Sequence, residues 1–99
     1  MLSKSEILES LSTQKQLLYK QFHVSEVGLF GSYVRDEQTE ISDIDILIDF
    51  EKGKTSFDNF LAAYDLLESL FPNKKVEVLT VGGLSKYIGP YILKEVVYV

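Results

Sequence analysis

Apolar residues recur along the chain with two different periods, which separate the predicted helices from the predicted strands. Over residues 3–21 they return at intervals of three or four positions, which predicts an amphipathic helix. Ser3 and Glu6 have the spacing of a capping box, so we expect this helix to begin there. Its apolar positions are Ile7, Leu8, Leu11, Leu18 and Phe22.

A second apolar stripe with helical spacing lies between Ser56 and Pro72. Thr55 or Ser56 can cap its start, and Pro72 stops it because proline has no backbone N–H to donate. We expect the stripe to pack into the core or an interface. It consists of Phe57, Phe60, Leu61, Tyr64, Leu67 and Phe71.

Three short apolar runs, at residues 26–30, 43–50 and 75–81, predict strands. The second run alternates strictly, which places its apolar and acidic positions on opposite faces of a sheet. One face carries Ile44, Ile46, Ile48 and Phe50; the other carries Asp43, Asp45, Leu47 and Asp49. The tail after Gly83 fits either a short helix or a terminal strand.

The order of these elements predicts one domain over residues 1–99 of the α/β or α+β class. We expect a small mixed sheet of three to four strands with helices packed on one face. Gly31-Ser32 breaks the chain after the first strand, and a short helix is expected to run from there through Arg35.

Composition narrows the range of functions. The net charge of −5 argues against a nucleic-acid surface, which requires clustered lysine and arginine. There are no cysteines, which excludes disulfides, zinc ribbons and cysteine nucleophiles. The sequence contains neither a signal-peptide pattern nor an apolar segment of membrane-spanning length. We therefore expect a cytoplasmic protein that has no contact with a membrane.

Two aspartates, Asp43 and Asp45, share the polar face of the alternating strand, about 7 Å apart along the backbone. Glu77 lies between two valines on the third strand, so it joins them if the two strands are neighbours. Carboxylates this close repel one another unless a cation lies between them or water solvates them fully. A pair of Mg²⁺ ions would meet that need.

The Gly31-Ser32 pair adds a second kind of site. Glycine allows a backbone to approach phosphate oxygens closely, and a helix start presents unpaired N–H groups. Taken alone, the pair is most simply a turn, and Asp43 with Asp45 is most simply a solvated face. Together, at a fixed spacing of ten residues, they point to a site for a nucleoside triphosphate.

The stretch "GSYVRDEQTEISDIDILIDF", residues 31–50, resembles the signature of the DNA polymerase beta-like nucleotidyltransferase superfamily. It is most similar to the minimal nucleotidyltransferase (MNT) domains, whose pattern is Gly-Ser, ten residues, then Asp-x-Asp. Gly31, Ser32, Asp43 and Asp45 match that pattern in type and spacing. The resemblance covers nearly the whole chain and implies the fold of that superfamily.

The resemblance assigns roles to further residues. Arg35 matches an arginine that often follows the Gly-Ser pair in the nucleotide site, although Asp36 stands where a glycine is common. Glu77 takes the place of a third aspartate and is one methylene longer. By resemblance, Asp43, Asp45 and Glu77 bind two Mg²⁺ ions and act in catalysis, while Gly31 and Ser32 hold the phosphates of ATP.

Small MNT proteins resemble antitoxins that are encoded beside a HEPN-domain toxin, a ribonuclease class. The resemblance implies transfer of AMP from ATP to a tyrosine hydroxyl of that toxin, within a hetero-complex or a self-associated form. Two alternatives stay open: neutralisation of the toxin by contact alone, and nucleotidyl transfer to a small molecule.

Overall fold

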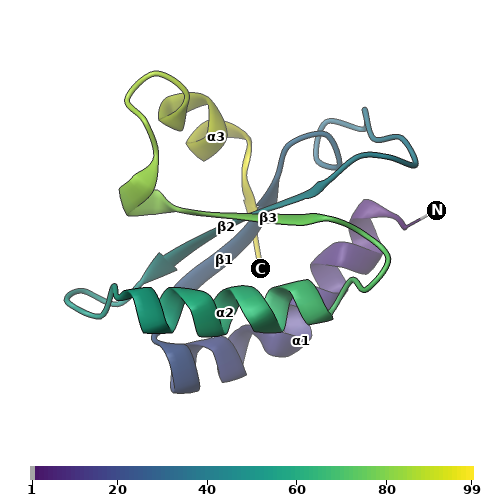
Figure 1. The fold of residues 1–99 in the computed structure, drawn as a ribbon. Coiled ribbons are helices and arrows are strands. Elements are labelled where there is room, and N and C mark those ends of the chain that lie inside the picture. Colours follow the sequence, from purple (N-terminus) through teal and green to yellow (C-terminus); the bar gives the residue numbers. More distant parts are fainter. Residues whose placement is uncertain (1) are drawn as a thin grey trace.

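The computed structural model describes residues 2–99, which form a single mixed sheet with helices on both of its faces (Figure 1). No helix within that range is both long and apolar enough to cross a membrane. The elements in chain order are α1 (Lys4–Phe22), β1 (Val24–Phe30), β2 (Ile44–Phe50), α2 (Phe57–Ser69), β3 (Val76–Thr80), the 3-10 helix η1 (Val81–Gly83), α3 (Gly89–Glu95) and β4 (Val97–Tyr98).

The four strands lie in the order β3-β2-β1-β4. β1 pairs antiparallel with both β2 and β4, whereas β2 pairs parallel with β3. Phe30, the last residue of β1, lies opposite Asp45, and Asp45 lies beside Glu77 on β3. The predicted fold class is confirmed, and the register brings the acidic positions of β2 and β3 next to each other.

α1 and α2 cover one face of the sheet and enclose the main core (Figure 1). The isoleucines of β2 at positions 44, 46 and 48 are fully buried in this core, as their alternation predicts. Ser3 and Glu6 form the predicted capping box. Ser56 caps α2 by accepting the Asn59 N–H.

α3 lies over the opposite face of the sheet (Figure 1), so the ambiguous tail contains both a helix and a strand. A smaller apolar cluster of Phe30, Leu47 and Ile92 joins α3 to β1 and β2. The tail packs closely against β1 at Gly28, where a β-carbon would lie 2.7 Å from Val96 Cγ2. The helices therefore occupy both faces, and not the single face predicted, with α3 covering only part of the second.

One local prediction is wrong. No helix forms from Ser32 through Arg35, because Asp36 adopts a left-handed φ of 58° that ends the first turn. The core takes up only part of the stripe on α2, since Phe57 and Leu61 are 74% and 44% exposed.

Candidate active site

The Gly31 bend lies directly against the carboxylate of Asp45. Gly31 follows the last residue of β1 and has a φ of 83°, a left-handed conformation that favours glycine. A β-carbon at this position would lie 3.0 Å from Asp45 Cγ and would overlap Oδ2. The bend requires glycine for two reasons, the backbone angle and the close approach of the acid.

A single tight turn follows the bend. The N–H groups of Val34 and Arg35 both donate to the Gly31 carbonyl, at 3.1 and 3.2 Å. The Tyr33 side chain is fully buried and fixes this turn to the main core. The Ser32 N–H and hydroxyl find no hydrogen-bond partner within residues 2–99, so both donors are available to an anion.

The three acidic residues share one face of the sheet. Asp45 and Glu77 are register partners in the parallel β2–β3 ladder, so their side chains leave the sheet on the same side. Asp43 lies two positions before Asp45 and forms a 3.9 Å ion pair with Lys75. The neighbouring apolar positions Ile46 and Val78 point into the main core on the other side.

The electrostatics of this face are centred on Asp45. Partial burial, followed by repulsion from Glu77 and Asp43, raises the pKa of the Asp45 carboxyl from 3.8 to about 6. Arg35 opposes the shift and Glu95 adds to it. A bound cation would offset the repulsion between the ionised Asp45 carboxylate and its acidic neighbours.

The donor set fits a hard divalent cation such as Mg²⁺, which prefers carboxylate oxygens. Asp43, Asp45 and Glu77 would hold it, and their mutual repulsion is what its charge would relieve. The side chains are not gathered into a complete ligand set, because no three acidic or histidine residues within residues 2–99 stand in metal-binding positions. Glu77 is exposed and has the longest side chain of the three.

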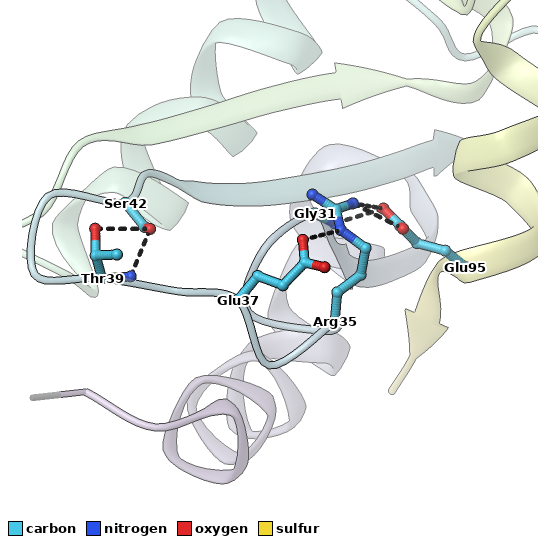
Figure 2. Close-up of polar contacts among 6 residues, drawn as sticks. All are labelled: Gly31, Arg35, Glu37, Thr39, Ser42 and Glu95. Atoms are coloured by element: carbon cyan, nitrogen blue, oxygen red, sulfur yellow. Dashed lines mark hydrogen bonds and ion pairs between the residues drawn. The ribbon is translucent and has the colours of Figure 1, made fainter.

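Arg35 is held by acids from two directions (Figure 2). Its Nε donates to Glu37 at 3.0 Å, and its Nη1 donates to both carboxylate oxygens of Glu95 at 2.9 and 3.1 Å. Glu95 also accepts the Gly31 N–H at 2.7 Å. No sequence pattern points to Glu95, which lies 64 residues from Gly31 in the tail.

These groups line one open cleft of about 380 Å³ between the Gly31 bend and α3. Its polar side holds Gly31, Arg35, Asp45 and Glu95; its apolar side is supplied by β1 and α3. The apolar lining consists of Phe30, Ile88, Tyr91 and Ile92. The cleft therefore brings together Gly31, Arg35 and Asp45 of the predicted site, whereas Ser32, Asp43 and Glu77 are not among the residues that line it.

A glycine bend with unpaired donors beside an acidic strand pair is typical of enzymes that act on nucleoside triphosphates. Residues 4–99 match the nucleotidyltransferase domain family. The chain belongs to this family and is a nucleotidyltransferase.

Other proteins are similar to this chain in sequence and in fold. Protein adenylyltransferase MntA of Thermococcus cleftensis is 41% identical over 99 residues, which are 100% of this chain and 98% of that protein. A solved structure described as a minimal nucleotidyltransferase is 28% identical, with a TM-score of 0.69 over 91% of this chain and 93% of the other. The resemblance to minimal nucleotidyltransferases is thereby confirmed.

A toxin-antitoxin crystal structure with AMP-PNP shares the fold at a TM-score of 0.63. It is 19% identical, and the match covers 87% of this chain and 69% of that one. This likeness concerns the fold of the matched part.

Proposed function

We propose that this protein transfers AMP from ATP to a tyrosine hydroxyl of a partner HEPN toxin and so acts as an antitoxin. One observation carries the proposal: the Gly31 bend and the acidic face of β2 meet at the same cleft. The name of the Thermococcus relative and the AMP-PNP in a toxin-antitoxin structure of the same fold support this choice of donor and acceptor.

The residues of the site take distinct parts in this reaction. Ser32 offers its N–H and hydroxyl to the β- and γ-phosphates, because these donors have no partner within residues 2–99. Arg35 adds positive charge at the cleft. Asp43, Asp45 and Glu77 would hold Mg²⁺, which when bound neutralises the charge that develops on the transferring phosphate.

The chemical step is a displacement at the α-phosphorus of ATP. The tyrosine oxygen forms a new bond to that phosphorus while the bond to the bridging oxygen of pyrophosphate breaks. Pyrophosphate leaves with the electron pair of the broken bond. The tyrosine proton passes to a carboxylate, for which exposed Glu77 beside Asp45 is the candidate.

A protein acceptor suits the charge of the molecule. With a net charge of −5, the chain has little attraction for the phosphates of a nucleic acid. A toxin partner can bring its own tyrosine to the open cleft. We place this reaction in the cytoplasm, where ATP and a newly made toxin are both present.

The test incubates the purified protein with α-labelled ATP, Mg²⁺ and its toxin partner, and follows the label on the toxin by mass. Transfer to a tyrosine is expected from the wild type. Asp43→Asn and Asp45→Asn should lower the rate by about 10³-fold, because each removes a ligand for the charge-neutralising cation. Asp65→Asn on α2, an exposed acid on the opposite side of the sheet, is the matched control.

The same experiment separates the alternatives. If both variants still neutralise the toxin and no label moves, the protein acts by contact alone. If the label appears on an added small molecule and never on protein, the acceptor assignment is wrong. Label on the toxin that is unaffected by Asp45→Asn would contradict the assignment of the site.

A further inference from the structure

Glu95 joins the end of the chain to the Gly31 bend. It is the last residue of α3, and its carboxylate bridges the Gly31 N–H and the Arg35 guanidinium (Figure 2). The side chain of Glu95 is 23% exposed, and its hydrogen bond to the Gly31 N–H is partly buried, whereas its contact with Arg35 faces the solvent. Hydrogen bonds to an ionised acceptor are stronger than neutral ones, and shielding strengthens them further.

The tail does not depend on this carboxylate for its place in the fold. Ile92 fixes α3 to Phe30 and Leu47 in the second apolar cluster. β4 then pairs with β1, and Val97 lies opposite Leu29 in that ladder. Apolar packing and strand pairing therefore hold the segments on both sides of Glu95, which leaves its carboxylate available for a role at the bend.

The carboxylate could hold the bend for a phosphate or occupy the phosphate's own position. Displacing it would break a 2.7 Å hydrogen bond and a close ion pair. The Ser32 N–H and hydroxyl, one residue further on, have no partner to displace within residues 2–99. A triphosphate that binds at Ser32 keeps the Glu95 contacts intact, so the lower-energy arrangement leaves Glu95 in place.

We propose that Glu95 is a positioning residue for nucleotidyl transfer: it fixes the Gly31 peptide and Arg35, and so keeps the Ser32 donors ready for the triphosphate. The inference rests on the proposed function. It makes the tail a part of the active site, since the residue that orients the bend lies next to the terminal strand.

Three variants separate the contacts of Glu95. Glu95→Ala removes both, whereas Glu95→Gln keeps an oxygen for the Gly31 N–H and loses the charge that faces Arg35. Glu37→Gln is the matched control, because Glu37 pairs with the same guanidinium at 3.0 Å but is not a partner of the Gly31 N–H. Thermal unfolding of each variant reports whether the fold survives.

Binding of ATP and of inorganic tripolyphosphate is measured by calorimetry, alongside the steady-state kinetics of transfer. Glu95→Ala should weaken both ligands about tenfold or more and raise the KM for ATP more than it lowers kcat. Glu95→Gln should recover most of the affinity, and Glu37→Gln should match the wild type. Hydrogen exchange at the Gly31 amide should speed up in Glu95→Ala alone.

Several results would overturn the inference. Tighter tripolyphosphate binding by Glu95→Ala would mean that the carboxylate competes with phosphate. An equal loss in Glu37→Gln would mean that only the charge balance of Arg35 matters, and unchanged binding would mean that Glu95 has no role. If the wild type binds tripolyphosphate but transfers no AMP, the proposed function fails while the binding comparison still decides the role of Glu95.

Discussion

One face of the sheet is apolar and the other is acidic, although β2 contributes side chains to both. On the face covered by α1 and α2, Ile44, Ile46 and Ile48 of β2 are fully buried. On the other face, Asp45 is only partly buried and lies among charges of its own sign. α3 covers this second face only beside the cleft.

The difference shows where the fold gains stability and where it gives stability up. Burial of an isoleucine contributes about 1.5–3 kcal/mol of hydrophobic free energy. Grouping acids around Asp45 works against folding, because each ionised carboxylate raises the free energy of the others. Under the proposed function, the folded protein carries this penalty before any cation binds.

The largest expected effect belongs to the core face. Ile46→Ala should lower the free energy of unfolding by about 3–4 kcal/mol, since it leaves a cavity at a fully buried position. Urea unfolding followed by circular dichroism measures this. Ile41→Ala, at a side chain that is 91% exposed, is the matched control and should change stability by less than about 0.5 kcal/mol. A loss below about 1 kcal/mol at Ile46 would contradict the assignment of this face as the core.

The next effect belongs to the junction between the two faces. Gly31→Ala should cost about 2–3 kcal/mol and abolish transfer, because it strains a φ of 83° and places a methyl group on the Asp45 carboxylate. Gly53→Ala is the control, since Gly53 has a φ of 79° but no atom within 4 Å of an added β-carbon. It should cost about 1 kcal/mol and leave transfer intact.

Equal losses of stability in the two glycine variants would mean that backbone strain alone explains Gly31. An active Gly31→Ala enzyme would separate the bend from the reaction. Both measurements use the same urea titration and the same labelled-ATP assay.

Strand periodicity was sufficient to predict which acids would share a face. The alternation in β2 separated Asp43 and Asp45 from the isoleucines, and the valines around Glu77 did the same on β3. The sequence did not predict that β2 and β3 pair, because a short strand does not specify its partner. That pairing, which makes Asp45 and Glu77 neighbours, had to be assumed. The structure shows the pairing and its register.

Contacts between distant segments could not be predicted in the same way. Asp36 ends the turn after Gly31 through a left-handed backbone angle that no local pattern announced. The bond from Gly31 to Glu95 spans 64 residues and depends on how α3 packs against Leu47. Apolar residues in the tail do not recur with a helical or a strand period. The tail contains a helix, α3, followed by a strand, β4.

The smallest expected effect comes from the electrostatic repulsion on the acidic face, which lowers the stability of the folded protein. The pKa of Asp45 is about 6 in the folded protein and 3.8 as the ordinary value, so the folded chain holds this proton more tightly than the unfolded chain. Stability therefore falls as pH rises from about 4 to 6, and the full penalty remains above that range. Asp45→Asn removes the charge and should be more stable than the wild type at pH 7.5.

We expect an advantage of about 1 kcal/mol at pH 7.5, after allowing for solvent screening of a partly buried carboxyl, and a smaller one at pH 4.5. Urea unfolding at both pH values measures it, with Asp65→Asn on the exposed side of α2 as the control. Added Mg²⁺ should stabilise the wild type and not Asp45→Asn, because a ligand stabilises only the state that binds it. An advantage that does not change with pH would mean that the repulsion around Asp45 is negligible, and the acidic face would then carry no penalty for a cation to relieve.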